Sequence, residues 1–530
     1  MYLYNARIHT LDSTCPFATA IAIQRDRIVA VGDEAAIWAE YSNREEGLDM
    51  QGRVILPGLT DAHIHLESYA LSLRWVDCET DTRQECLDRV AERARETPPG
   101  EWILGHGWNQ NNWPEGFGSA ADLDAVAPDN PVYLSAKSYH AGWANSMAFK
   151  RAGVSAATPD PLNGRLGRAA IGAPDGILFE SAMDLVANAI PEATAEQVEQ
   201  AILAAQKVLW RMGLTGLHDF DGRSCFMALQ NLLQRGELNI RVLKGIPLPD
   251  LQYAVGLGLR SGFGNDMLRI GGVKAFMDGA LGPHTAAMLQ PFKGGPQQDR
   301  GMLFMDAEQL FEHGRLAAQN GLPLAVHAIG DRANHEVLEA FDHLRRFEQE
   351  QRITSLGGRL RHRIEHVQLL HPDDAGRLAA LGVTASMQPF HATSDMLMAD
   401  RFWGERTAYS YAWKLQLQHQ ANLAFGSDAP VESPNPFWGL HAAVTRRRKD
   451  GRPGPQGWIP AQRIGLGEAL RAYTYGAAYA AGMEDRLGKL ASNYLADLIV
   501  LEQDPFECEA DELYKLQPSA TMVGGEWVFN

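Results

Sequence analysis

Two histidines separated by one residue, His63 and His65, stand in the sequence DAHIHL. In a β-strand alternate side chains share a face, so both imidazoles point one way while Ile64 points the other. Two imidazoles that lie two residues apart on one strand are about 6–7 Å from each other, and they suit joint coordination of one metal ion. Two hydrogen-bonded polar residues at a strand end would give the same pattern. The pair alone leaves both interpretations open.

Three further polar residues stand where predicted strands would end. His327 closes the run in GLPLAVHAIGD, His366 closes RHRIEH, and Asp428 follows ANLAFGS. Each one alone is more often a structural residue. The parallel strands of a barrel, however, deliver the residues at their carboxyl ends to one mouth. Histidine and aspartate are nitrogen and oxygen ligands that suit Zn²⁺, Fe or Mn, so the set favours a metal site.

Lys274 lies inside an otherwise apolar segment, GGVKAFMDGA. A charged lysine in a buried strand needs a partner or a shifted protonation state. One interpretation is structural: the amino group reaches solvent or pairs with Asp278. The other is functional, with the lysine chemically modified into a carboxylate. The residues themselves leave this choice open.

The elements that must position these side chains are short apolar strands alternating with longer helical patterns. Repeated strand–helix units imply parallel strands with right-handed crossovers, in either an open doubly wound sheet or a closed (β/α)8 TIM barrel. No G-x-G-x-x-G motif follows the first strand to support a dinucleotide-binding sheet. Eight candidate strands favour the barrel, within an α/β fold. These strands are expected near residues 59–65, 214–219, 240–246, 270–277, 322–328, 362–367, 382–387 and 421–427.

Both ends of the chain differ from this pattern. Residues 1–55 and roughly 486–530 contain short alternating segments rich in Ile and Val, and we expect them to form one composite β-sandwich. The barrel then occupies residues 56–485. Residues 70–195 are rich in Trp, Pro, Asn and Gly and interrupt the strand–helix alternation. We interpret them as an inserted subdomain over the carboxyl-terminal mouth of the barrel, where active sites lie.

Composition narrows the classes of partner. The net charge of −17 disfavours nucleic acid and anionic membrane surfaces as partners. The one basic run, residues 446–449, is expected on a solvated loop or helix face. Five scattered cysteines without C-x-x-C spacing argue against a disulfide framework and a thiolate metal site. With no apolar stretch near the roughly 18 residues of a membrane span and no leader pattern, we expect a cytoplasmic protein.

Five motifs in this order and spacing make a resemblance specific: PGLTDAHIHL, VKAFMDG, AVHAIGDRAN, RIEHVQ and FGSDAPVE. The chain resembles the amidohydrolase superfamily of metal-dependent hydrolases. More narrowly it is similar to the amidohydrolase-3 branch, which includes enzymes like N-substituted formamide deformylase. The similarity runs nearly end to end and includes GWNQNNWP and YHAGWANSMAF in the insertion. The H-x-H pair alone is weak evidence, whereas the ordered set is strong.

The resemblance implies a (β/α)8 barrel flanked by a β-sandwich built from both termini. It also implies a centre of one or two zinc ions, with Fe or Mn as alternatives, in which the lysine is N-carboxylated. The implied metal ligands are His63, His65, Lys274, His327, His366 and Asp428.

The implied activity is hydrolysis of a non-peptide carbon–nitrogen bond of the amide type, in a small molecule, by a metal-bound hydroxide. Asp428 is the candidate catalytic residue, which takes the proton of the attacking water and passes it to the leaving nitrogen. Seven residues are candidates for substrate contacts, each with a structural role as an equally weighted alternative. They are His140, Gln388, Asp278, Glu180, Trp108, Asn109 and His391.

Other functions stay open. A mononuclear aminohydrolase would release ammonia from a cyclic amidine, although Lys274 favours a two-metal site. A non-catalytic barrel scaffold would be expected to have gaps in the ligand set, and none is found. A nucleotide-dependent enzyme lacks a glycine loop that could hold phosphates. The sequence does not name the substrate, and a homodimer is compatible with it.

Overall fold

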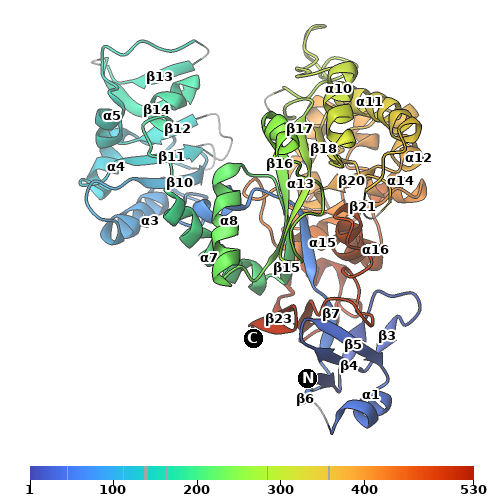
Figure 1. Cartoon of the computed structure of the whole chain (residues 1–530). Helices are drawn as coiled ribbons and strands as arrows, with labels where there is room; N and C mark the ends of the chain where they lie inside the picture. The colour runs from blue at the N-terminus through green and yellow to red at the C-terminus, as the bar shows by residue number, and fades with distance from the viewer. Residues whose placement is uncertain are drawn as a thin grey trace. The chain divides into compact units, whose positions relative to one another are not determined.

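The computed structural model describes residues 1–43, 46–110, 113–136, 141–162, 164–170, 172–282, 284–355 and 358–530. The chain divides into two compact units. Residues 1–69 and 199–530 form the first, called the barrel unit here. Residues 70–198 form the second, called the inserted unit. Figure 1 shows both along the course of the chain.

The barrel unit contains an eight-stranded parallel sheet in the order β21-β20-β19-β18-β17-β16-β15-β8. The sheet closes on itself, because a parallel bridge joins Ile64 to Ala429 just beyond β21. The (β/α)8 fold expected from the sequence is confirmed, and every expected strand range overlaps an observed strand. The strands are β8 (Leu59–Ile64), β15 (Leu214–Asp219), β16 (Arg241–Pro247), β17 (Leu268–Phe276), β18 (Leu324–Ala328), β19 (Arg363–His366), β20 (Thr384–Met387) and β21 (Leu423–Phe425).

Helices follow the strands along the chain and cover the sheet (Figure 1). In α11, the buried residues Val337, Leu338, Phe341 and Leu344 recur at helical spacing, which gives this helix one apolar face. The strands themselves are short apolar runs buried on both sides, as expected for a parallel sheet. The main helices are α7 (Ala195–Arg211), α8 (Arg223–Arg235), α9 (Leu251–Gly256), α10 (Ala307–Gln319), α11 (Asp331–Glu350), α12 (Arg377–Leu381), α13 (Pro389–Phe402), α14 (Trp413–Gln418), α15 (Pro436–Thr445) and α16 (Leu466–Arg471).

The two ends of the chain meet in a pair of small sheets. One sheet has the order β5-β4-β1-β6 and the other β24-β23-β22-β7-β2-β3. The pairing of β7 with β22 joins the ends, since Ile55 lies opposite Val500. Leu3, Ile8 and Leu498 are buried in the core between them. The strands are β1 (Tyr2–Tyr4), β2 (Arg7–His9), β3 (Phe17–Ala18), β4 (Ala20–Gln24), β5 (Arg27–Gly32), β6 (Gly47–Asp49), β7 (Val54–Pro57), β22 (Leu498–Leu501), β23 (Pro518–Val523) and β24 (Glu526–Phe529).

The inserted unit has its own sheet, in the order β13-β14-β12-β11-β10-β9, and its own helices. Its core is aromatic, with Trp108, Trp113 and Trp143 buried together. The elements are β9 (Val76–Asp77), α3 (Arg83–Glu96), β10 (Ile103–Trp108), α4 (Ala120–Val126), β11 (Val132–Ala136), β12 (Ala141–Ala144), α5 (Ser146–Ala152), β13 (Gly164–Arg168) and β14 (Pro174–Glu180).

One expectation about the surface is wrong. Arg446, the first residue of the basic run 446–449, is fully buried rather than solvated. Its guanidinium group donates to the carbonyl oxygens of Trp458 and Tyr411, each at 2.8 Å. It also lies 4.3 Å from the centre of the Trp413 ring. These partners are distant in sequence, so the run itself gives no sign of them. Separately, no helix in the described part of the chain is long and apolar enough to span a membrane.

Candidate metal centre

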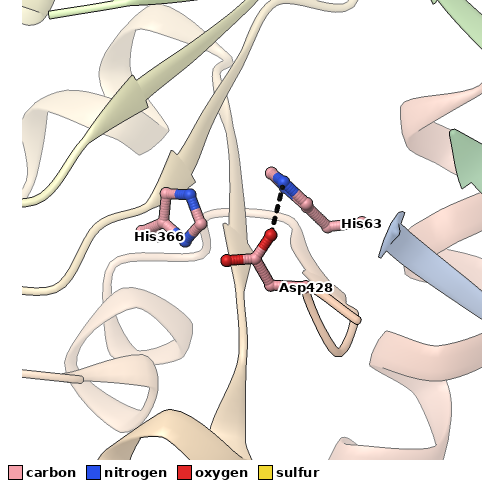
Figure 2. A group of neighbouring side chains, drawn as sticks. All are labelled: His63, His366 and Asp428. Carbon is pink, nitrogen blue, oxygen red and sulfur yellow. Dashed lines mark ion pairs between the residues drawn. The ribbon is translucent and has the colours of Figure 1, made fainter. Parts of the chain in front are cut away.

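Three side chains from three strand ends converge at the carboxyl-terminal mouth of the barrel. His63 lies near the end of β8, His366 ends β19, and Asp428 follows β21. Each offers one ligand atom, and these atoms all lie within 4.8 Å of one another. His63 Nε2 is 3.3 Å from Asp428 Oδ1, the contact drawn in Figure 2. A group of this composition and spacing can hold a metal ion.

The other predicted ligands line the same cavity, which has a volume of about 300 Å³. His65 Nε2 lies 3.5 Å from Asp428 Oδ1. Lys274 Nζ lies 3.3 Å from His63 Nε2. The rings of His327 and His366 have centroids 4.5 Å apart. The structure therefore brings all six predicted ligands around one cavity.

The backbone at two of these residues departs from regular strand geometry. His366 has φ of 76° and Asp428 has φ of 61°, both in the left-handed region that non-glycine residues rarely adopt. Regular alternation would direct Glu365 and His366 to opposite faces. Here both approach the same histidine, because Glu365 Oε2 is 2.6 Å from His63 Nδ1 and His366 belongs to the cluster with His63. Such conformations cost about 1–3 kcal/mol each and concentrate at functional sites.

A buried carboxylate orients His63. Glu365 is completely buried and receives hydrogen bonds from Arg363, one of them at 2.9 Å through Nη2. Burial by itself would raise the pKa of Glu365, but the charge of Arg363 and the hydrogen bond from His63 hold it well below its usual range. The ionised carboxylate therefore accepts the Nδ1–H proton of His63. The lone pair of Nε2 is then directed toward Asp428 and Lys274.

Two more histidines are held through the same ring nitrogen. His65 Nδ1 lies 3.1 Å from Asp221 Oδ1, and His366 Nδ1 lies 2.8 Å from Gln388 Oε1. His327 is held differently, with Nε2 3.0 Å from the carbonyl oxygen of Gly279. Partners of this kind fix the ring orientation and tautomer of metal-binding histidines.

The amino group of Lys274 neither reaches solvent nor pairs with Asp278, so the structural interpretation of this lysine is wrong. Its side chain is buried, with Nζ 4.5 Å from the centre of the Phe220 ring and 5.0 Å from that of Phe276. Burial lowers the pKa of its amino group to about 8. The suggested partner, Asp278, instead accepts hydrogen bonds from the amides of Ala287, Ile329 and Gly330 at 2.8–3.0 Å.

The residues predicted to contact substrate fall into separate places. His391 lines the cavity, whereas Gln388 does not line it and instead makes a hydrogen bond to Nδ1 of His366. Asp278 does not line the cavity, because its carboxylate is occupied by the three backbone amides.

The remaining four candidates lie within residues 70–198, the inserted unit. Trp108 is fully buried and stacks on Trp113, with centroids 6.0 Å apart, so it packs the core of that unit. Asn109 and Glu180 belong to the same unit, and their contact with substrate stays a prediction. His140 lies outside the described residues.

Several residues of the site were not predicted from the sequence. Regular strand alternation directs Glu365 to the face opposite His366, and Asp221 lies just after the end of β15. Gln368 and Asp395 line the cavity from positions near His366 and His391. A signal exists for two of them: Gln368 is two residues beyond a predicted ligand, and Asp395 is one helical turn beyond His391 on α13. The Arg363–Glu365 pair has no such signal.

The chain matches a known protein family over most of its length. The amidohydrolase family matches residues 46–529 of the chain. Protein LONG AFTER FAR-RED 3 of Arabidopsis thaliana is 32% identical over 541 aligned residues, covering 99% of this chain and 91% of that protein. N-substituted formamide deformylase of Arthrobacter pascens is 28% identical over 99% of this chain and 97% of that protein.

A solved structure agrees with these matches. The crystal structure of an uncharacterized metal-dependent hydrolase from Pyrococcus furiosus superposes with a TM-score of 0.78 at 28% sequence identity. The superposition covers 96% of this chain and 99% of that one.

Proposed function

Because this chain belongs to the amidohydrolase family, we propose that it is a metal-dependent hydrolase that cleaves a non-peptide carbon–nitrogen bond of the amide type. The family and the metal-dependent hydrolase of similar structure support hydrolysis with a divalent metal. The name of the deformylase relative supports an amide-type bond.

One observation carries the assignment of a metal. His63 donates through Nδ1 to Glu365, so its Nε2 lone pair points at Asp428 Oδ1, only 3.3 Å away. A lone pair and a carboxylate oxygen repel each other unless a cation lies between them. The same carboxylate oxygen is 3.5 Å from Nε2 of His65, whose Nδ1 is also held by a carboxylate. The donor set therefore fits a divalent ion.

We propose that the metal is bound by six residues: His63, His65, His327, His366, Asp428 and the N-carboxylated form of Lys274. The lysine amine adds to carbon dioxide and loses one proton, which gives a carbamate with two anionic oxygens. Its position supports this step, since Nζ is buried between two aromatic rings and directed at His63 Nε2.

When bound, a divalent ion of this kind polarises a carbonyl and lowers the pKa of water toward about 7. The chain supplies the remaining steps. Asp428 accepts a proton from the attacking water and delivers it to the leaving nitrogen. The Arg363–Glu365 pair keeps His63 in one tautomer throughout. The apolar residues Phe276, Leu281 and Val431 line the cavity and take the hydrocarbon part of the substrate.

The test combines metal analysis with a substrate panel. Purified full-length protein is assayed for bound metals per chain, then for hydrolysis of N-alkyl formamides, N-acyl amino acids and cyclic amidines before and after chelation. Amide hydrolysis that disappears on chelation and returns with metal supports the proposal. Full activity of metal-free protein would refute it. Ammonia release from an amidine, with one metal per chain, would instead support the aminohydrolase alternative.

The carbamate has its own measurement. Protein equilibrated with ¹³C-labelled bicarbonate should give a carbamate carbon signal in the NMR spectrum of the wild type, and none in Lys274→Arg. Persistence of the signal in the variant would assign it to another amine.

A further inference from the structure

One wall of the cavity carries three polar side chains that are not among the predicted metal ligands, although one of them, His391, pairs with Asp428. Gln368 follows β19, and His391 and Asp395 lie one turn apart on α13. All three line the same cavity as the predicted metal ligands. We call these three residues the polar wall.

One member of the polar wall presents a buried atom without a hydrogen-bond partner among the described residues. This atom is Oε1 of Gln368, a residue that is 4% exposed, whereas Nε2 of His391 lies 3.6 Å from Oδ2 of Asp428. A buried polar atom left without a hydrogen bond destabilises the protein. Because Gln368 lines the cavity, a ligand in it is the natural source of the missing hydrogen bond.

The third member presents a carboxylate. The hydroxyl group of Tyr411 donates to Asp395 Oδ2 at 2.6 Å. No described residue donates to the other oxygen, Oδ1, in a side chain that lines the cavity and is partly exposed. This oxygen can therefore accept a hydrogen bond from a ligand.

Tyr411 is itself firmly fixed, so the orientation of Asp395 is set before any ligand binds. Tyr411 is buried, and its amide donates to the carbonyl oxygen of Gln368 at 2.7 Å. Its own carbonyl oxygen accepts from Arg446 Nη1 at 2.8 Å. Arg446 is in turn enclosed by Trp413 and Trp458, 4.3 and 5.0 Å from the ring centres. Preorganisation of this kind raises affinity because less freedom is lost on binding.

The chemistry of the polar wall selects the complementary group. A carboxylate oxygen and a carboxamide oxygen are hydrogen-bond acceptors, so they match N–H donors. Lys274 is the one amino or guanidinium group among the described residues that line the cavity, and it faces His63. A substrate carboxylate placed against Asp395 and Gln368 would meet two acceptor oxygens, one of them on a carboxylate, and would be repelled.

We infer that Asp395 and Gln368 bind an N–H-bearing nitrogen of the substrate, so that this enzyme takes neutral or cationic amides in preference to N-acyl amino acids. The nitrogen is either the N–H of a secondary amide or a protonated amine, and the test below separates these two sources. The inference rests on the proposed function and specifies its substrate class.

Binding is measured first, because it does not require turnover. Metal-loaded full-length protein is titrated calorimetrically with 2-phenylethylamine, 2-phenylethanol and 3-phenylpropanoate, which share an apolar ring and differ in the polar group. The wild type should bind the ammonium compound most tightly. Asp395→Asn should weaken that binding about tenfold, since the hydrogen bond between the ammonium group and Asp395 loses its negative charge. Its affinity for the alcohol should not change.

A matched control lies on the same helix. Asp400 accepts from the indole of Trp458 at 2.9 Å and does not line the cavity. Asp400→Asn should therefore bind all three compounds as the wild type does. Tighter binding of the phenylpropanoate than of the ammonium compound by wild type would overturn the inference, as would equal ammonium affinities in wild type and Asp395→Asn.

Turnover separates the two sources of the N–H group. A secondary amide is compared with its N-methylated tertiary counterpart, and both with an analogue that carries a distant ammonium group. If the amide N–H is recognised, N-methylation lowers kcat/KM in the wild type and has a smaller effect in Asp395→Asn and Gln368→Met. If a protonated amine is recognised, only the ammonium analogue responds to these variants. Absence of turnover with every amide would contradict the proposed function, while the calorimetry still decides this inference.

Discussion

Replacing Glu365 with glutamine separates two roles of one buried carboxylate. Glu365 is fully buried and ionised, with one oxygen 2.6 Å from His63 Nδ1 and with Arg363 as its counter-charge. Glutamine keeps the shape and removes the charge. The guanidinium group of Arg363, whose side chain is 5% exposed, is then left buried without a counter-charge. Breaking a buried ion pair in this way lowers the free energy of unfolding by about 3–5 kcal/mol.

The second role concerns the metal. Glutamine can donate as well as accept, so His63 is no longer held in the tautomer that directs the Nε2 lone pair into the centre. Loss of such a supporting partner typically weakens metal binding about 10–100-fold, or about 1.4–2.7 kcal/mol. Urea unfolding of the metal-free protein measures the first effect. Competition with a chromophoric chelator measures the second.

The chain contains a close control for this experiment. Glu348 is a buried carboxylate that also binds one arginine and one histidine, with Arg345 Nη1 and His362 Nε2 each 2.6 Å away. None of these three residues lines the metal cavity. Glu348→Gln should lower the unfolding free energy by a similar amount and leave metal affinity unchanged. If Glu365→Gln binds metal as tightly as Glu348→Gln does, the reasoning about His63 is wrong.

Three further results are expected. Asp428→Asn should lower kcat by about 10²–10⁴-fold, the usual contribution of a positioned proton acceptor, with an unchanged circular dichroism spectrum; turnover at the wild-type rate would contradict its assigned role. Gly426→Ala should weaken metal binding in the chelator assay, because the added Cβ would lie 2.4 Å from the backbone nitrogen of His63 and would push the strand end away; unchanged affinity would show that the strand adapts. Burial lowers the pKa of His362 to about 4, so in acid this histidine binds a proton near pH 6.5 in the unfolded chain but only near pH 4 in the folded chain. The free energy of unfolding is therefore unaffected by His362 above pH 6.5, and it falls by about 3 kcal/mol as the pH drops to 4. Urea unfolding at pH 7 and 4.5 should show a smaller acid loss in His362→Gln, and an equal loss would refute this assignment.

The barrel could be predicted because its signal is local. The strands are short and mostly apolar, and at the ends of four of them stand the polar residues His63 and His65, His327, His366 and Asp428. His63, His65 and His327 need nothing more than this periodicity to be directed toward one cavity. Lys274 is recognisable for the opposite reason, since a charged residue within an apolar run is unusual without a chemical purpose.

The residues that orient the predicted metal ligands could not be predicted from the sequence. Their positions depend on departures from regular strand alternation and on partners that are distant in the sequence. Alternation separates Glu365 from His366, and only the left-handed backbone at His366 and the following Val367 brings both to the centre. Periodicity cannot report such a conformation, because it is maintained by the packing around it.

Arg446 shows the same limit more sharply. A run of basic residues is normally solvated, and nothing within residues 446–449 distinguishes the first from the others. Its burial depends on Trp413, Trp458 and the carbonyl oxygen of Tyr411, all outside the run. Through Tyr411 this arginine also fixes Asp395, and so the predicted contact with the substrate nitrogen. The predicted metal ligands are thus visible as local exceptions to a strand pattern. The orientation of the residues inferred to contact the substrate depends in addition on contacts between distant segments, which a sequence pattern does not report.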